Sequence, residues 1–369
     1  MKQELAASVC ALVPSRGLGG GIESYVRASL EALEANGAQV IEMPLQTPEQ
    51  PLSLRRKAEF AVEVIRKAQA NRKQGLTVII AFHPSFARVA SIARRVAGSR
   101  TRGFVVYHAL DLFQGRVRPP KGLTLVAVST FTAGMLARYG NAAVLHAGIP
   151  RARYERLMAG PVRAEPGDEH RVLSVFQLSS FVGKGGPCII EACERLRADG
   201  RPITLTFAGH GHAAPELSAA AADRDWIRVH ESPTDSDLDA LFRDVELFVL
   251  ATRSRYREGT SGEGLGLVLV EASLAGLPLV APAYGGSADA FVEGLTGLKP
   301  SDESPEALGV TIAWAFDHPE ETERMAASAR VWASAAFGPE AHSASAAELF
   351  LGGAPRHAFW GVDIHPVRT

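Results

Sequence analysis

The sequence predicts an α/β protein with two doubly wound parallel-sheet domains. Short apolar runs rich in β-branched residues alternate along the chain with longer segments of helical periodicity, and this rhythm occurs twice. Runs that are apolar throughout indicate strands buried on both faces, and helices between them imply parallel pairing with right-handed crossovers. The length of 369 residues suits two domains of ordinary size better than one core.

Each expected element can be placed in order. The strands of the first half are expected near residues 5–13, 39–43, 76–82, 103–107 and 123–128. The helices between them are expected near residues 22–36, 54–74, 85–97 and 131–139. The strands of the second half are expected near residues 172–177, 203–208, 226–230, 247–250 and 279–281, with helices that include 187–198 and 237–243. Helical patterns then fill residues 303–351.

The domain boundary is expected in residues 151–171. This segment is charged, contains Pro161, Pro166 and Gly167, and lacks strand periodicity. We therefore predict an N-terminal domain over residues 1–160 and a C-terminal domain over residues 165–338.

Composition excludes several classes of function. With 39 basic and 40 acidic residues the formal net charge is −1, so no global field favours nucleic acid or an anionic membrane. The three cysteines lack the spacing of a disulfide framework or a zinc site, and they indicate buried thiols in a reducing cytoplasm. No apolar run has the length of a membrane span. The first apolar run follows no net positive charge and precedes no cleavage pattern, so we interpret it as a buried strand.

The segment with the most chemical information is SGEGLGLVLVEASLAGLPLVAP, residues 261–282. Glu263 lies among glycines, and the following residues predict a buried helix that Gly276 and Pro278 end. A helix N-terminus presents unpaired amides and the positive dipole end to an anion. Glu271 lies in an otherwise apolar run, where an unpaired charge is costly, and a carboxylate can bridge two adjacent hydroxyls. The combination suits a phosphate joined to a ribose.

This segment resembles the E-x7-E signature of the retaining glycosyltransferases of family 4. The resemblance implies the GT-B fold, in which two Rossmann-like domains face a central cleft. It also implies that residues 340–369 cross back onto the N-terminal domain. In that family the N-terminal domain binds the acceptor and the C-terminal domain binds the nucleotide sugar.

The resemblance further implies roles for individual residues. Glu263 would hold hydroxyls of the donor sugar, His108 would help to place that sugar, and Lys184 would bind the diphosphate together with the amides that begin the helix. Glu271 would hold the ribose. The residues expected to bind the donor are Gly20, Gly21, Gln177, Lys184, Gly209, Gly264, Leu265, Gly266, Leu267 and Glu271.

Two glycine-containing turns contribute to this set. The loop PSRGLGGGIESYV resembles the Gly-Gly-x-Glu segment of the family, and its amides can be directed at phosphate or sugar oxygens. Glu23 lies in the first turn of the following helix, where we expect it first as a cap. Gly209 lies in FAGHGH, which resembles the Gly-x-Gly turn of the nucleotide domain.

One departure from the family pattern concerns the diphosphate. The family has an arginine after the first strand of the second domain, where this chain has Gln177. Either the alignment shifts in a longer loop, or another cation substitutes. Arg253 and Arg255 are candidates for that cation or for acceptor binding, and a solvated face is the alternative. His83 and Asp111 are further candidates for the acceptor side.

No metal is expected at the site. The D-x-D patterns at Asp223 and Asp235 precede a tryptophan and a helix, and we interpret them as turn and cap chemistry. The resemblance implies a nucleotide-diphosphate sugar as the donor substrate and no required cofactor. No carboxylate pair has the character of a hydrolase acid and nucleophile.

The predicted function is transfer of a hexosyl or N-acetylhexosaminyl unit, with UDP favoured, to a hydroxyl of a small acceptor in natural-product or cell-surface glycoconjugate synthesis. The alternatives are an epimerase-like enzyme of the same fold and a non-catalytic nucleotide-sugar-binding module.

The composition, rich in Ala and Arg with few Lys, is typical of GC-rich bacteria. The arginine-rich helices of the first half lack exposed aromatic residues, so membrane association is not expected.

Overall fold

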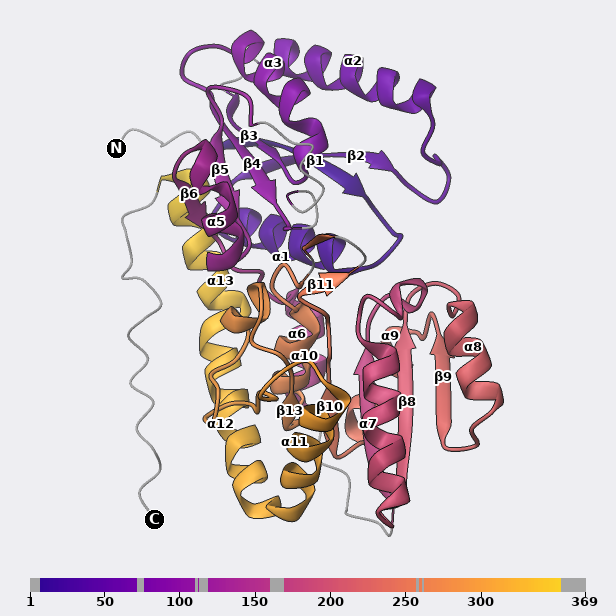
Figure 1. Cartoon of the computed structure of the whole chain (residues 1–369). Coiled ribbons are helices and arrows are strands. Elements are labelled where there is room, and N and C mark those ends of the chain that lie inside the picture. Colours follow the sequence, from indigo (N-terminus) through magenta and orange to yellow (C-terminus); the bar gives the residue numbers. More distant parts are fainter. Residues whose placement is uncertain are drawn as a thin grey trace. The chain divides into compact units, whose positions relative to one another are not determined.

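The computed structural model describes residues 7–71, 76–109, 112, 119–159, 169–256, 259–260 and 262–352. These residues form two compact units (Figure 1). One unit contains residues 7–151 and 337–352, and the other contains residues 152–336. The last helix of the described residues therefore belongs to the same unit as their first strand.

The first unit is built on a six-stranded sheet in which all neighbouring strands are parallel. The strand order is β2-β1-β3-β4-β5-β6, so the chain reverses direction across the sheet between β1 and β3. The strands are β1 (Ser8–Ser15), β2 (Gln39–Gln46), β3 (Leu76–Ala81), β4 (Arg102–Tyr107), β5 (Thr124–Ala127) and β6 (Ala142–Val144). Leu12 of β1 lies opposite Ala81 of β3, which fixes the register at the centre of the sheet.

Helices cover both faces of this sheet (Figure 1). The helices are α1 (Gly21–Ala35), α2 (Leu54–Asn71), α3 (Ala87–Ala97), α5 (Thr130–Leu136) and α13 (Pro339–Ala346), with a π-helical turn at Ala347–Leu351. Side chains alternate along a strand, and Leu12 accordingly shares a buried cluster with Phe60 of α2. On the other face, α1 packs against α13. Phe350 follows α13 and lies 5.1 Å from Phe104 of β4, measured between ring centroids.

The second unit has a five-stranded parallel sheet of order β13-β10-β7-β8-β9. Its strands are β7 (His170–Val175), β8 (Ile203–Gly209), β9 (Ile227–Glu231), β10 (Leu247–Val249) and β13 (Leu279–Val280). The helices of this part of the chain are α6 (Arg151–Ala159), α7 (Gly186–Ala198), α8 (Pro215–Ala222), α9 (Asp235–Arg243), α10 (Leu267–Leu274), α11 (Pro305–Asp317) and α12 (Pro319–Phe337). A short antiparallel pair, β11 (Arg255–Tyr256) and β12 (Gly259–Thr260), precedes α10. The chain reverses direction between β7 and β10.

The prediction of two parallel-sheet domains is confirmed, and the differences are local. Residues 151–159, expected to be part of an irregular linker, form α6, on which Arg153 and Leu157 are buried one turn apart. The charged composition of this segment obscured its helical pattern. The short strand β6 and helix α8 were not predicted. Residues 160–168 lie outside the described part of the chain.

Side chains cap the N-termini of α5 and α9, and the cap at α9 lies in the D-x-D segment that was interpreted as cap chemistry. Ser129 is the N-cap of α5 and accepts from the Thr132 amide at 3.1 Å. Asp235 begins α9, whose N-terminus carries a capping box between Thr234 and Asp237. In the ranges that the structure describes, no helix combines the length and the hydropathy that crossing a bilayer requires.

Candidate active site

The second sheet changes winding direction between β7 and β10, and ligands of open α/β sheets bind at the carboxyl ends of the strands at such a point. The segment after β7 supplies Lys184, and the segment after β10 supplies Thr252. The segment before α10 brings Glu263 to the same place, because its backbone pairs with Gly285 beyond β13. The Glu263 carbonyl accepts from the Gly286 amide at 2.9 Å.

Glu263 is held by two side-chain donors. Lys184 Nζ and Thr252 Oγ1 both donate to Glu263 Oε1, each at 2.5 Å. The Glu263 side chain is 14% exposed and the Lys184 side chain 25%. Because the cluster joins segments from two neighbouring strands, the sheet fixes the position of the carboxylate.

The same contacts decide the charge of Glu263. Burial acts to raise the pKa of this carboxyl group, but the Lys184 charge and the hydrogen bonds from Lys184 and Thr252 outweigh it and leave the pKa lowered. Glu263 is therefore ionised at neutral pH and serves as an acceptor of hydrogen bonds rather than as a proton donor.

The N-terminus of α10 follows Glu263 directly. Gly266, the N-cap residue, has φ 83° and ψ 56°, a left-handed conformation that favours glycine. The Leu269 amide donates to the Gly266 carbonyl at 2.8 Å, whereas the amides of Leu267 and Val268 precede the first bond within the helix. A helix start of this kind attracts an anion through its amides and its dipole. Gly264 and Leu265 complete the connection between Glu263 and this turn.

Glu271 projects from the second turn of the same helix. Its Oε1 accepts from Nε of Arg153 at 3.2 Å, and its side chain is 17% exposed. The two glutamates of the predicted pair thus lie on one continuous segment. Both have a cationic partner in the second unit.

Two other predicted donor residues, Gln177 and Gly209, have different surroundings. Gln177 is exposed and precedes a 3₁₀ turn at Leu178–Ser180. Gly209 ends β8, and a Cβ placed there would lie 1.7 Å from the carbonyl oxygen of Phe176. The glycine at this position is therefore required by close packing of the chain after β7. Lys184, by contrast, contacts Glu263 directly.

The candidate cation Arg253 is engaged with the segment that precedes α11. Its Nη1 donates to the Glu303 carbonyl at 3.2 Å, and its Nε lies 3.5 Å from Glu303 Oε2. The Ser254 amide also donates to Glu303, at 2.7 Å. The backbone of Arg255 forms β11, and the side chain of Arg255 lies outside the described residues.

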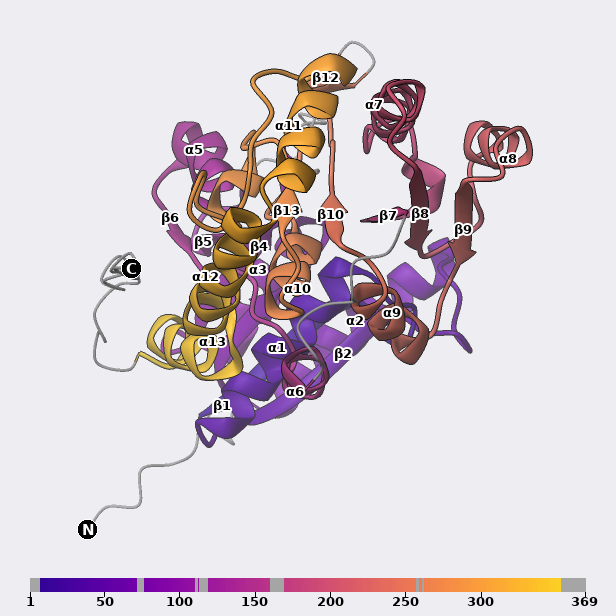
Figure 2. The same ribbon diagram turned by 90° about the horizontal axis from the view of Figure 1, so that it is seen from below.

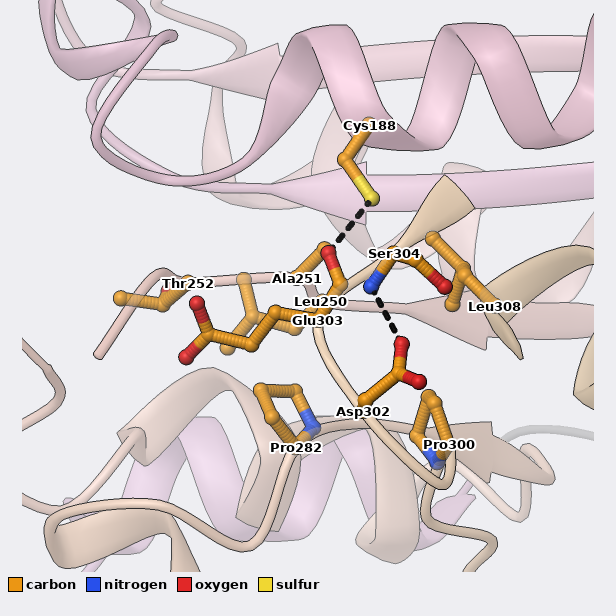
Figure 3. A pocket seen from close by; sticks show the side chains of 10 residues that line it. All are labelled: Cys188, Leu250, Ala251, Thr252, Pro282, Pro300, Asp302, Glu303, Ser304 and Leu308. Atoms are coloured by element: carbon orange, nitrogen blue, oxygen red, sulfur yellow. Dashed lines mark hydrogen bonds between the residues drawn. The ribbon is translucent and has the colours of Figure 1, made fainter. Parts of the chain in front are cut away.

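A small pocket lies next to this cluster. Thr252 and Glu303 line it together with Cys188, Leu250 and Pro282, among others (Figure 3). Burial raises the pKa of the Cys188 thiol to about 11, so the group is a neutral thiol at pH 7. A neutral thiol is a poor nucleophile, and Cys188 is not part of the proposed chemistry. Cys10 and Cys193 are likewise free and buried.

The carboxyl edge of the first sheet carries the predicted histidines. His83 follows β3, and its Nδ1 lies 2.8 Å from Ser85 Oγ while it caps the turn at Pro84–Phe86. His108 follows the neighbouring strand β4, and its Nε2 lies 2.9 Å from the Phe82 carbonyl oxygen. A carbonyl only accepts, so this contact requires the proton of His108 on Nε2. Asp111 lies outside the described residues.

The glycine-rich loop after β1 is organised by Glu23. The carboxylate accepts from the amides of Gly17 at 2.7 Å and of Leu18 and Gly19 at 3.1 Å each. Glu23 therefore caps the loop that precedes α1 rather than the first amides of that helix. Gly20 is the N-cap of α1 with φ 99°, and Gly21 begins the helix.

Sequence reasoning missed two residues of the site, Thr252 and Arg153. A signal existed for Thr252, which is among the first polar residues after a buried strand. For Arg153 there was none, since an arginine in a charged segment predicts a solvated side chain.

Comparison with known proteins shows which families and structures the chain is similar to. Residues 161–332 match the family model of the glycosyl transferases group 1. The chain is 30% identical over 160 residues to D-inositol 3-phosphate glycosyltransferase of Streptomyces griseus, covering 42% of this chain and 32% of that protein. It is 27% identical over 234 residues to a GDP-mannose-dependent phosphatidylinositol monomannoside mannosyltransferase of Mycobacterium tuberculosis, covering 61% of this chain and 60% of that protein. The matches thus span about a third and about 60% of these relatives.

Solved structures extend the likeness to both units. A glycosyltransferase from Rickettsia africae has a TM-score of 0.74 at 16% identity, covering 93% of this chain and 97% of that one. Anabaena HepE, solved in complex with UDP-glucose, has a TM-score of 0.68 at 18% identity, covering 93% and 98%. At such identities the likeness shows the fold. The chain therefore has the GT-B fold, and its residues 161–332 match the model of the glycosyl transferases group 1 family.

Proposed function

We propose that the protein is a retaining glycosyltransferase of family 4 that moves a hexosyl or N-acetylhexosaminyl unit from a nucleotide-diphosphate sugar, UDP favoured, to a hydroxyl of a small acceptor. The observation that supports this most is the ionised Glu263, held by Lys184 and Thr252 beside the N-terminus of α10. A carboxylate that accepts hydroxyl protons and a helix start that binds phosphate stand next to each other in one segment.

In this proposal each group has one task. Glu263 accepts hydrogen bonds from hydroxyls of the donor sugar. The ammonium of Lys184 and the amides that begin α10 stabilise negative charge on the departing diphosphate. Glu271 accepts from the ribose hydroxyls, and His108 helps to place the sugar. The remaining candidates, His83 and Arg253, belong to the acceptor side.

The bond changes balance without a further reactant. The bond between the anomeric carbon and the diphosphate oxygen breaks, and the bond to the acceptor oxygen forms on the same face. The departing phosphate takes the proton of the acceptor hydroxyl. The protein contributes orientation and charge stabilisation, and no metal ion has a part in the proposal.

The names of two relatives suggest where to search for the acceptor. Both names include inositol, as D-inositol 3-phosphate in one and as phosphatidylinositol monomannoside in the other. A cyclitol with several hydroxyls, free or phosphorylated, is therefore the first acceptor class to test.

The test is incubation of the full chain with a panel of UDP-, GDP- and ADP-sugars and cyclitol acceptors, followed by mass spectrometry and NMR of the product. We expect a glycosylated acceptor that keeps the anomeric configuration of the donor. Glu263→Gln should lower the rate by about 10²-fold or more, because the hydrogen bonds to the sugar lose their charge. Release of free or isomerised sugar without transfer, or a Glu263→Gln variant with the parent rate, would contradict the proposal.

A further inference from the structure

Arg153 on α6 is a buried cation whose guanidinium joins two carboxylates. Its Nε donates to Glu271 Oε1 at 3.2 Å, and its Nη1 pairs with Asp239 on α9. The side chain is 10% exposed, and its Cζ lies 5.7 Å from the ring centroid of Phe242. Helix α6 lies beside α9 and α10 (Figure 2). Two carboxylates and an aromatic ring therefore fix the orientation of this guanidinium.

Glu271 depends on that guanidinium for its own orientation. Its neighbours Val270 and Ala272 are buried and apolar, so they offer its carboxylate no hydrogen bond. Within the described part of the chain, Arg153 is the hydrogen-bond partner of Glu271, and it contacts Oε1. A glutamate has several rotatable bonds, and a charge-assisted contact to a fixed donor selects one arrangement of them. The Glu271 side chain is 17% exposed, so it is not fully enclosed by the protein.

The Arg153 contacts are incomplete for a purely structural ion pair. Its Nη2 is buried and has no hydrogen-bond partner among the described residues. By covalent structure Nη2 lies on the same edge of the guanidinium as the Nε proton, which is the edge that faces Glu271. Arginine and carboxylate commonly bind through both donors of such an edge. A buried donor left unpaired beside a partly exposed glutamate side chain requires a functional explanation.

We propose that Arg153 is a positioning residue that sets the selectivity of the site for ribonucleotides. It holds Glu271 in the orientation that accepts hydrogen bonds from both ribose hydroxyls, and Arg153 itself does not contact the nucleotide. The inference rests on the proposed function, which assigns Glu271 to the ribose. Without Arg153 the carboxylate loses its fixed direction, and the 2′-hydroxyl loses most of its contribution to binding.

The experiment measures one ratio, the dissociation constant of 2′-deoxy-UDP divided by that of UDP, by isothermal titration calorimetry on the full chain. The same ratio is measured for 2′-deoxy-GDP and GDP. The conclusion is drawn from whichever pair, UDP or GDP, has the ribonucleotide that binds more tightly. For the parent chain we expect a ratio of about 10 or more, since a hydrogen bond to a charged group is lost in the deoxy form. Glu271→Ala should bring the ratio to about 1. Arg153→Met should bring it within about twofold of 1.

Arg156→Met is the matched control. Arg156 lies on the same helix and also pairs with Asp239, at 2.8 Å, but its other partner is Asp235. This variant should keep the parent ratio. Arg153→Lys retains the charge without the planar fork and should give an intermediate ratio. It is the deciding variant if circular dichroism shows that Arg153→Met does not fold.

The outcomes separate the inference from the proposed function. If Glu271→Ala has a ratio of about 1 but Arg153→Met keeps the ratio of the parent chain, Arg153 does not position Glu271. Where Arg153→Met does not fold, the same conclusion is drawn from Arg153→Lys. A parent ratio in Glu271→Ala instead overturns the assignment of Glu271 to the ribose. Neither result depends on an identified acceptor. An Arg153 variant that binds both nucleotides more weakly but keeps the parent ratio also contradicts the inference. Such a result would show general damage to the site, whereas the inference requires a change in the ratio.

Discussion

The carboxyl edges of the two sheets both carry a glutamate beside glycines, and they use it in different ways. In the first unit, backbone amides of the loop after β1 donate to the carboxylate of Glu23. In the second unit, the side chains of Lys184 and Thr252 hold Glu263, and the first amides of α10 precede any bond within the helix. Three amides of the first loop are therefore occupied by a carboxylate of the same chain, whereas Glu263 leaves the amides that begin α10 to other partners.

The largest effect is expected for Lys184, the cation at the carboxyl edge of the second sheet. Lys184→Met removes the ammonium that neutralises Glu263 and that, in the proposed function, stabilises the departing diphosphate. We expect kcat for sugar transfer to fall by about 10²- to 10³-fold. Steady-state kinetics at saturating donor measures it. Lys299→Met is the control, because Lys299 pairs with Glu293 at 2.9 Å elsewhere in the unit. A Lys184→Met rate within threefold of the parent would refute the role of this lysine.

A smaller effect is expected at the first edge. Glu23→Ala leaves the loop amides without their carboxylate and should lower the free energy of unfolding by about 1–3 kcal/mol. Urea denaturation measures this change. Arg27→Ala is the control, since Arg27 is 3.9 Å from Glu23 and its side chain is 63% exposed. Weaker donor binding by Glu23→Ala without loss of stability would contradict this prediction. It would show that the loop after β1 binds the donor, as proposed for the start of α10.

The smallest effect concerns pH. The pKa of Glu263 is lowered in the folded protein: burial acts to raise it, but Lys184 and Thr252 outweigh burial. A lowered folded-state pKa contributes stability above the unfolded-state value, about 4.3 for a glutamate, and that stability is lost as the pH falls through the folded-state pKa. The parent should therefore lose a stability advantage over Glu263→Gln on acidification. Thermal unfolding of both proteins across this range tests it. An advantage that grows towards acid would show the opposite shift.

The sequence predicted the central strands, such as β1 and β8, because they are runs of buried and mainly apolar residues. The strand β7 and the helix α10 could be placed within a few residues for this reason. The strand β6 was missed because it is three residues long and contains no run of buried apolar residues. Helix α6 was missed because arginine and glutamate dominate it, and only its contacts show that Arg153 is buried.

The candidate site was predictable where one segment carries several of its parts. Glu263, the helix start and Glu271 are close in sequence, so a local pattern finds them. The partners of these carboxylates come from distant segments, with Lys184 79 residues from Glu263 and Arg153 118 residues from Glu271. Such pairs depend on the topology of the sheet. No local pattern could have connected them.

The return of the last helix to the first sheet has a consequence for biosynthesis. Phe350 is fully buried in the first unit, where its ring lies against Phe104. Residues 152–336 of the second unit precede Phe350 in the chain, so the ribosome makes them first. The first unit must therefore wait for α13 and the turn after it before its sheet is covered completely, and this interval is where a chaperone would act.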